Sequence, residues 1–197
     1  MKILHIDCSP RPVSHSRRLS AAIVARMRAR HPDATVVRRD LGRDPLPHAE
    51  PDYAAALSSP DALAAGLANG AVRLSEQLIQ EVEAAGILVI GTPMNNFTVP
   101  SVLKAWIDQI LRIGRTFTSL STGKAGLLRD RPVFIGIASG GVFTGERANQ
   151  PDFLTPYMRA ALGCIGLNTL HFLPLQATAF LDDERLAAAR ETLLATL

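Results

Sequence analysis

Hydroxyl and cationic side chains crowd a short segment near the N-terminus. The segment reads DCSPRPVSHS and contains Ser9, Arg11, Ser14, His15 and Ser16. Serine hydroxyls and an arginine can donate hydrogen bonds to a phosphate, and a bond to a charged group contributes roughly 1.5–3 kcal/mol. The segment also contains Cys8, a residue type that can act as a nucleophile. It therefore predicts either a phosphate-binding turn or a reactive cysteine.

The spacing argues against the reactive cysteine. Low-molecular-weight tyrosine phosphatases have a loop of the form C-x-x-x-x-x-R, which would place an arginine at position 14, where Ser14 stands. The loop also matches neither G-x-G-x-x-G nor G-x-x-x-x-G-K-[ST], so it does not predict a pyrophosphate or triphosphate site. A phosphate monoester fits the segment better. The competing interpretation is that Ser14 or Ser16 simply caps a helix.

Two other segments have residue types suited to a ligand. The first comprises Pro93, Met94, Asn95, Asn96 and Phe97, and the second comprises Ser139, Gly140 and Gly141. Carboxamides donate and accept hydrogen bonds, as the edge of a pyrimidine-like ring requires. Glycines let backbone N–H groups approach a flat ligand without a Cβ in the way. Each segment alone is also compatible with an ordinary turn.

Continuous apolar strands alternate with helices along the chain. We expect strands at 3–6, 34–37, 87–90, 133–138 and 168–173, and helices at 17–30, 74–85, 102–111, 155–162 and 184–197. This alternation is typical of a parallel sheet covered on both faces. The pattern therefore predicts an α/β three-layer sandwich with five parallel strands in the order 2-1-3-4-5. Residues 40–71 are expected to form a long, weakly patterned connection with room for some helix of its own, and residues 115–131 a loop.

The predicted fold brings the three polar segments together. Open parallel sheets bind ligands beyond the carboxyl ends of their strands, where the strand order reverses. Here that point lies between the first and third strands, and all three segments follow strands at that edge. A phosphate site beside a site for a hydrogen-bonding ring describes FMN.

Composition narrows the class of protein. The 197 residues carry a net charge of +3 and are 47% apolar, which suits one soluble domain. No apolar run approaches the roughly 20 residues that span a bilayer, and no signal-peptide pattern occurs, so we expect a cytoplasmic protein without a membrane partner. The scattered charges do not predict nucleic-acid binding. The histidines lack metal-ligand spacing, so no metal is expected, and Cys8 and Cys164 are expected to be reduced thiols.

These motifs resemble those of the FMN-dependent NADH-azoreductase family, a branch of the flavodoxin-like quinone reductases. The resemblance covers nearly the whole chain. It rests on Ser9, SHS at 14–16, PMNNF at 93–97, LKAWID at 103–108, GRTF at 114–117, SGG at 139–141, LTPY at 154–157 and LGCIG at 162–166. It implies a flavodoxin-like fold in which residues 1–197 form a single FMN-binding domain.

The resemblance also implies an activity. Such a protein would be a homodimer with two active sites at the subunit interface. It would take a hydride from NADH or NADPH and reduce quinones or azo compounds by a ping-pong, two-electron mechanism. The flavin carries the hydride, so no catalytic side chain is implied. The backbone N–H groups of Gly140 and Gly141 would stabilise the negative charge left on the flavin.

The expected site residues follow from the matched motifs. Cofactor-binding residues are Ser9, Arg11, Ser14, His15, Ser16, Pro93, Met94, Asn95, Asn96, Phe97, Ser139, Gly140 and Gly141, where Arg11 is our own addition. Substrate-pocket residues are Phe117, Ser119 and Phe143.

Three positions depart from the family's usual residues. Asn95 replaces a tyrosine, Ser139 stands in a loop that usually has an arginine before its glycines, and Ser119 replaces an aromatic. The sequence therefore does not specify the preferred electron acceptor, and it does not distinguish NADH from NADPH as the donor. Two other hypotheses remain at this point. One is a flavodoxin-like electron carrier without its own substrate turnover, and the other is a flavin-free binding module that uses residues 40–71 as its contact surface.

Overall fold

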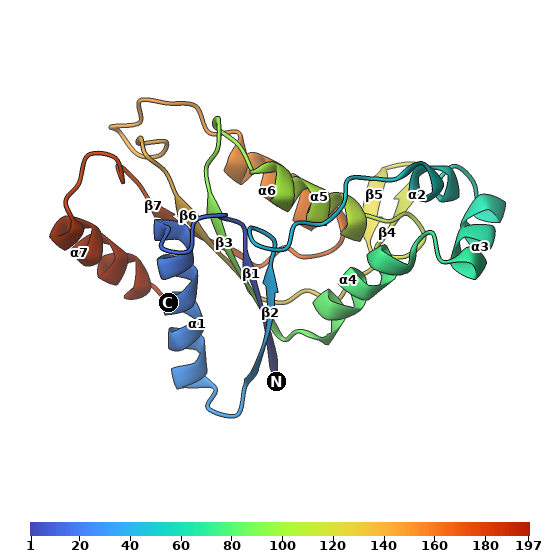
Figure 1. Cartoon of the computed structure of the whole chain (residues 1–197), viewed down its shortest axis with the longest axis horizontal. Coiled ribbons are helices and arrows are strands. Elements are labelled where there is room, and N and C mark those ends of the chain that lie inside the picture. Colours follow the sequence, from blue (N-terminus) through green and yellow to red (C-terminus); the bar gives the residue numbers. More distant parts are fainter.

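The computed structural model describes residues 1–197, apart from the side chain of Pro60. Strands and helices alternate along the chain (Figure 1). The strands are β1 (Lys2–Asp7), β2 (Thr35–Asp40), β3 (Ile87–Pro93), β4 (Phe117–Leu120), β5 (Gly123–Gly126), β6 (Val133–Ala138) and β7 (Leu170–Leu175). The helices are α1 (His15–Arg30), α2 (Pro51–Ala56), α3 (Pro60–Asn69), α4 (Arg73–Ala84), α5 (Ser101–Ile110), α6 (Leu154–Cys164) and α7 (Asp183–Leu194).

Five strands form one parallel sheet in the order β2-β1-β3-β6-β7. The predicted order 2-1-3-4-5 is the same order under a different numbering, because β4 and β5 pair only with each other. The parallel register aligns Asp7 of β1 with Gly91 of β3, and Pro93 of β3 with Ala138 of β6. The carboxyl ends of β1, β3 and β6 therefore meet at one edge of the sheet.

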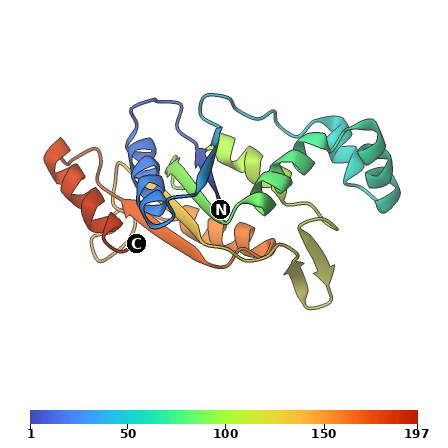
Figure 2. The same ribbon diagram turned by 90° about the horizontal axis from the view of Figure 1, so that it is seen from below.

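Helices cover both faces of the sheet, which gives the expected three layers (Figures 1 and 2). Alternate residues of each strand point to opposite faces. Leu4 of β1 packs in the core beneath α4, α5 and α6, whereas Ile3 packs in the core beneath α1 and α7. Trp106 of α5 is fully buried in the first of these cores, so its side chain packs entirely within one protomer.

Two glycines let α1 approach the sheet closely. A Cβ at Gly91 of β3 would lie 2.5 Å from Ser20 Oγ, and a Cβ at Gly136 of β6 would lie 3.0 Å from the Leu19 side chain. Larger residues at these strand positions would push α1 outward. The N-terminus of α1 is thereby held close to the ends of β1 and β3.

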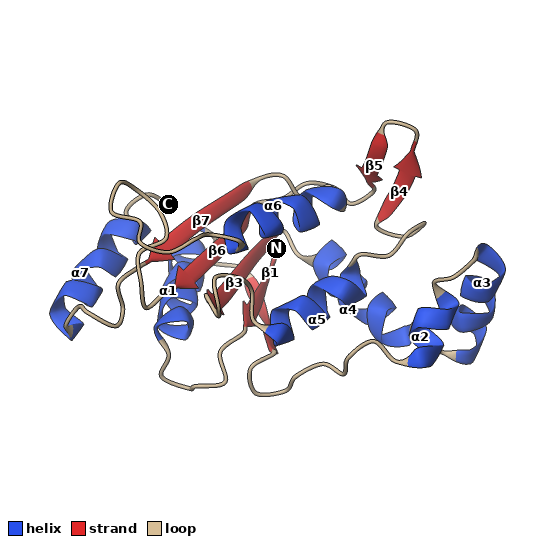
Figure 3. Cartoon of the chain, turned by 90° about the horizontal axis from the view of Figure 1, so that it is seen from above, coloured by secondary structure: helices blue, strands red, loops and turns tan.

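The expected loop at 115–131 is wrong, because this segment contains the antiparallel hairpin β4–β5. Both strands have four residues, too few to display an alternating pattern, and Gly123 supplies a φ of +131° near the turn. The connection at 40–71 contains α2 and α3. The hairpin and these two helices project from the end of the molecule opposite α1 and α7 (Figures 2 and 3).

An ion-pair network ties α4 to the turn after α5. Glu76 accepts hydrogen bonds from Arg115 and from the buried Arg112, and Arg115 also pairs with Glu83. The hydrogen bonds and charge of Arg115, and then of Arg112, lower the pKa of Glu76 from 4.5 to about 2. A carboxyl group with a lowered folded-state pKa stabilises the fold above its unfolded pKa, and this contribution is lost as the pH falls through the folded value.

We therefore expect Glu76→Gln to flatten the acid side of the stability curve. The free energy of unfolding of the wild type should fall more steeply than that of the variant between about pH 4.5 and pH 2. Over this range the wild type should lose about 1–2 kcal/mol more unfolding free energy than the variant. A fully buried carboxylate with the same pKa shift would lose about 3 kcal/mol, and the value is smaller here because Glu76 is partly exposed. Urea unfolding at a series of pH values measures it. Glu146→Gln, at an exposed loop carboxylate, should run parallel to the wild type, and a parallel Glu76→Gln curve would refute the expectation.

Candidate functional site

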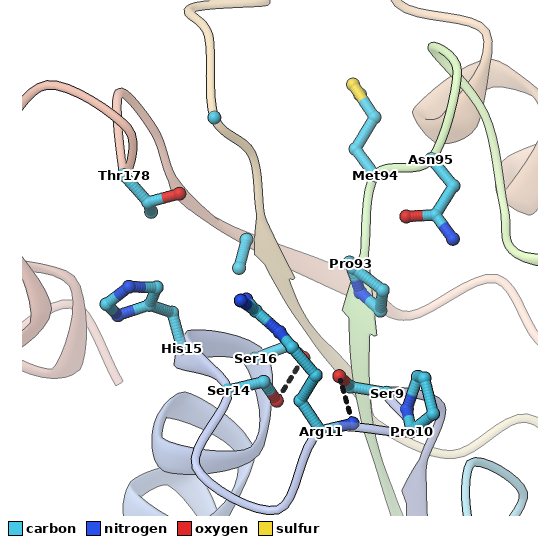
Figure 4. Close-up of a pocket in the computed structure, with 12 residues that line it drawn as sticks. Ser9, Pro10, Arg11, Ser14, His15, Ser16, Pro93, Met94, Asn95 and Thr178 are labelled. Atoms are coloured by element: carbon cyan, nitrogen blue, oxygen red, sulfur yellow. Dashed lines mark hydrogen bonds between the residues drawn. The ribbon is translucent and has the colours of Figure 1, made fainter.

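A cavity of about 370 Å³ lies beyond the carboxyl ends of β1, β3 and β6 (Figure 4). It occupies the place at which the strand order reverses. Its lining comes from all three predicted segments and from the loop after β7. The lining residues are Ser9, Pro10, Arg11, Ser14, His15, Ser16, Pro93, Met94, Asn95, Ala138, Gly140 and Thr178.

Three buried serines form the floor at one end of the cavity. Ser14 is the N-cap of α1, and its Oγ accepts a hydrogen bond from the Arg17 N–H at 3.3 Å and lies 3.3 Å from Ser16 Oγ. Ser9 Oγ accepts a hydrogen bond from the Arg11 N–H at 3.3 Å. Within the described chain, the N–H groups of His15 and Ser16 have no hydrogen-bond acceptor. Free N–H groups at a helix N-terminus make an anion-binding site.

The cations at this end of the cavity differ in character. Arg11 is exposed, and in Figure 4 its side chain extends past Ser14 and Ser16. Among the described residues its guanidinium has no hydrogen-bond or ion-pair partner, so it is available to an anion. Burial, with the neighbouring Arg18 and Arg11, holds the pKa of His15 below its ordinary value. The imidazole is therefore neutral at neutral pH, and the site's positive charge comes from Arg11 and the helix.

A second arginine, Arg17, binds the backbone of the loop that contains Ser9. Arg17 Nε and Nη2 donate hydrogen bonds to the Ser9 carbonyl oxygen at 2.9 and 2.6 Å, and Nη1 donates to Asp40 Oδ2 at 2.7 Å. Arg38 of β2 donates to Asp7 Oδ2 at 2.8 Å. Arg17 thus fixes the backbone of the loop, and its charge is already matched by carboxylates.

Asp7 is the buried anchor of this network. Burial alone would raise its pKa, but hydrogen bonding and charge from His5, with hydrogen bonds from Arg38 and Ser20, outweigh burial and lower the pKa to about 2. Asp7 is therefore ionised at neutral pH and gives the arginines behind the serine loop a fixed partner.

The loop after β3 makes a tight turn at the cavity rim. Asn95 and Thr98 exchange two backbone hydrogen bonds of 3.0 Å, and the two residues between them have positive φ, 47° at Asn96 and 71° at Phe97. This is the backbone of a two-residue hairpin turn, which strongly prefers glycine. Pro93, Met94 and Asn95 line the cavity. Asn96 and Phe97 do not, and the Phe97 ring is 43% exposed.

The loop after β6 presents backbone groups. Gly140 lines the cavity, whereas Ser139 is buried behind it and Gly141 lies beyond the lining. The carbonyl oxygens of these three residues accept bonds from the loop after β7, which holds Thr178 beside them. Within the described chain the N–H groups of Gly140 and Gly141 have no acceptor. Both are therefore unpaired, and Gly140 presents its N–H where it borders the cavity.

None of the three expected substrate-pocket residues lines the cavity of this protomer. Phe117 is buried in the hairpin region under Lys124, whose Nζ lies 4.6 Å from the ring centroid. Ser119 is exposed on β4, on the hairpin that projects away from α1 (Figure 3). Phe143 is buried in the core, and its N–H donates to Gln176 Oε1 at 2.7 Å.

The structure gives no support to a reactive cysteine. Cys8 is fully buried, and burial, with the charge of Asp7, raises the pKa of its thiol. A thiol that does not ionise is a poor nucleophile. No group of metal-ligating side chains occurs among the described residues. Across the described chain, every helix is too short or too polar to span a bilayer.

Comparison with known proteins gives consistent matches along the chain. A family model described as flavodoxin-like fold matches residues 1–197. The chain is 48% identical over 192 residues to FMN-dependent NADH:quinone oxidoreductase 4 of Pseudomonas fluorescens, covering 97% of this chain and 89% of that protein. It is 46% identical over 191 residues to FMN-dependent NADH:quinone oxidoreductase 5 of Burkholderia lata, covering 95% and 90%.

Solved structures of similar shape include azoreductases. The structure of azoreductase from Bacillus anthracis has a TM-score of 0.85 and 25% identity, and the match covers 100% of this chain and 98% of that one. An FMN-dependent NADH-azoreductase from the same species, solved in complex with FMN, has a TM-score of 0.81 at 23% identity, covering 99% and 96%. The latter likeness is one of fold.

Proposed function

Because the chain belongs to the family of flavodoxin-like fold proteins, and its relatives at 46–48% identity are FMN-dependent NADH:quinone oxidoreductases, we propose that it is such an enzyme. It would pass a hydride from NADH, through bound FMN, to a quinone or an azo compound. The observation that carries the proposal is the cavity at the strand-order reversal. It joins an anion-binding helix N-terminus to two loops with free polar groups.

The residues present fit FMN. A phosphate monoester carries about two negative charges and several acceptor oxygens, and the serine end offers three hydroxyls, two free N–H groups and the Arg11 cation. The loop after β6 offers the free N–H groups of Gly140 and Gly141, and the loop after β3 offers the Asn95 carboxamide. These groups are donors and acceptors of the kind that a flavin ring edge requires.

The chain's own part is to bind, orient and stabilise charge. Bound FMN supplies the hydride chemistry. Ser9, Ser14 and Ser16 would hold its phosphate with Arg11. The Gly140 and Gly141 N–H groups would stabilise negative charge on the reduced ring, as an oxyanion hole does. The roles of these residues, and those expected for His15, Pro93, Met94, Asn95, Asn96, Phe97 and Ser139, stay predictions.

We also propose that the enzyme is a homodimer with active sites at the subunit interface. The hairpin that contains the buried Phe117 and the exposed Ser119 projects away from the cavity of its own protomer, so it would contribute to a cavity only in another copy (Figure 3). Exposed Ile113, Leu120 and Leu127 give the same region apolar surface to bury. An intracellular donor such as NADH fits the cytoplasmic location expected from the sequence.

Anaerobic spectroscopy with steady-state kinetics tests the activity. The purified protein should be yellow, NADH should bleach it, and a quinone should restore the colour. Initial rates at varied NADH and quinone should give the parallel reciprocal plots of a ping-pong mechanism. Light scattering should give a mass near twice 21.2 kDa. If the yellow colour persisted after NADH was added, NADH would not be the electron donor. Bleaching without sustained reduction of quinone would indicate an electron carrier.

A further inference from the structure

Gln150 connects two of the loops that line the cavity. Its Nε2 donates a hydrogen bond to Ser139 Oγ at 2.9 Å and to Met94 Sδ at 3.2 Å. Met94 belongs to the loop after β3 and lines the cavity, and Ser139 directly precedes Gly140, which also lines it. Gln150 itself is partly buried and does not belong to the cavity lining. One side-chain amide therefore joins two loops that come from different strands.

The amide oxygen of Gln150 lies close to the backbone of Gly141. A Cβ at Gly141 would lie 2.5 Å from Gln150 Oε1 and 3.0 Å from Cδ, so the glycine makes room for the amide. The preceding residue is also fixed, because Asn149 Oδ1 accepts a hydrogen bond from the Val142 N–H at 3.1 Å and its N–H donates to the Val142 carbonyl at 2.9 Å. The loop thus presents the Gln150 donor in one direction.

Charge at this position matters as well as shape. The three residues that lie against the Gln150 amide, Met94, Ser139 and Gly141, are all uncharged. A neutral donor here helps to keep the cavity rim free of negative charge. A carboxylate in its place would lose the two donor hydrogens and would repel negative charge on a bound ligand.

We propose that Gln150 is a positioning residue for bound FMN. It acts by fixing Met94, which lines the cavity, and Ser139, which directly precedes the lining residue Gly140, and by keeping negative charge away from them. The inference rests on the proposed function, because FMN is the ligand that Met94 and Gly140 would contact.

The first test needs no flavin. The chain has four methionines, so methyl-labelled methionine gives a spectrum that can be assigned by substitution. In flavin-free protein, Gln150→Ala should shift the Met94 methyl signal and leave those of the buried Met27 and Met158 in place. Arg147→Ala, at an exposed position in the same loop, should move none of them. An unmoved Met94 signal in Gln150→Ala would refute the contact.

The second test measures FMN affinity and reduction potential. Gln150→Ala should raise the Kd of FMN about tenfold, because binding would then have to order the Met94 side chain that Gln150 holds in the free protein. Gln150→Glu should in addition weaken binding of reduced FMN more than that of oxidised FMN. Each tenfold of that preference lowers the two-electron midpoint potential by about 30 mV. A merely structural role would weaken both forms equally, so an unchanged potential in Gln150→Glu would overturn the proposal.

A double-mutant cycle separates this inference from the proposed function. Gly141→Ala should displace the amide and raise the Kd of FMN, with little further effect when it is combined with Gln150→Ala. Fully additive effects on the Kd would show that Gly141→Ala does not act through the Gln150 amide. A wild type that fails to bind FMN would refute the proposed function itself. Tight wild-type binding with an unchanged Gln150→Ala would refute only the role of Gln150.

Discussion

Replacing Ser14 with aspartate is expected to abolish tight FMN binding without harming the fold. Ser14 is the N-cap of α1 and is one of the three hydroxyls at the anion end of the cavity. Aspartate caps a helix as well as serine does, and its charge is favourable at a helix N-terminus. The same charge would face the FMN phosphate, which it repels.

The expected loss is large because the two charges would be close together. At an effective dielectric constant near 20, unit charges 4 Å apart interact by about 4 kcal/mol, and the phosphate carries nearly two charges. Even after screening by salt, the Kd of FMN should rise at least ~100-fold. Fluorescence titration of flavin-free protein with FMN measures this change.

Ser14→Asn is the matched control, since asparagine has the shape of aspartate without its charge and is an equally good cap. Its Kd for FMN should stay within about tenfold of the wild type. Both variants should unfold at similar temperatures when flavin-free. If Ser14→Asp bound FMN as tightly as Ser14→Asn, the phosphate would not lie at the N-terminus of α1.

Arg17→Met is expected to cause a large loss of stability. The Arg17 side chain is 10% exposed and pairs with Asp40 and Asp7, which are themselves 14% and 1% exposed. Removing one partner of a buried ion pair costs about 3–5 kcal/mol when the remaining charge is uncompensated. We expect a loss near the lower end, about 3 kcal/mol, because Arg38 still pairs with Asp7 and Asp40. The Ser9 carbonyl also loses two hydrogen-bond donors. Urea unfolding of the flavin-free protein measures the effect without stabilisation by ligand.

Two further variants make this prediction specific. Arg18→Met changes the exposed neighbour on the same helix and should alter stability by at most about 0.5 kcal/mol. Adding Asp40→Asn to Arg17→Met removes one of the carboxylates that lost its Arg17 partner, and it should restore part of the lost unfolding free energy. If Arg17→Met unfolded within about 1 kcal/mol of the wild type, the network behind the serine loop would not stabilise the fold.

The sheet and the anion end of the site were predictable because their signals are local. Continuous apolar strands between amphipathic helices specify a parallel sheet, and the order of the five strands followed from that pattern. The serines before the helix expected at 17–30 predicted a cap at Ser14 or Ser16, and the helix begins at His15 with Ser14 as its cap. These features need only neighbouring residues and the general geometry of α/β folds.

The sequence did not reveal which residues of each loop face the cavity. Asn96 and Phe97 belong to the matched motif, but a turn with two positive φ values places them outside the lining. The asparagines were compatible with a turn, but this turn usually contains glycine, and Phe97 in its second position gave no sign of a positive φ.

Residues that arrive from distant segments were also missed. Thr178 reaches the cavity from the loop after β7, and Gln150 reaches Met94 across 56 positions of the chain. Such contacts depend on how loops cross in three dimensions. Phe117 and Ser119 illustrate the opposite case, since their motif matches the family but the hairpin that carries them lies away from the cavity of their own protomer.

Calorimetric titration of the flavin-free wild type with FMN and with riboflavin tests the serine and arginine site most directly. The two ligands share the flavin ring, and only FMN carries the phosphate that Ser9, Ser14, Ser16 and Arg11 would hold. We expect FMN to bind at least ~100-fold more tightly, since several charge-assisted hydrogen bonds would be lost with riboflavin. Equal affinities for the two flavins would contradict the phosphate site, and with it the placement of FMN in this cavity.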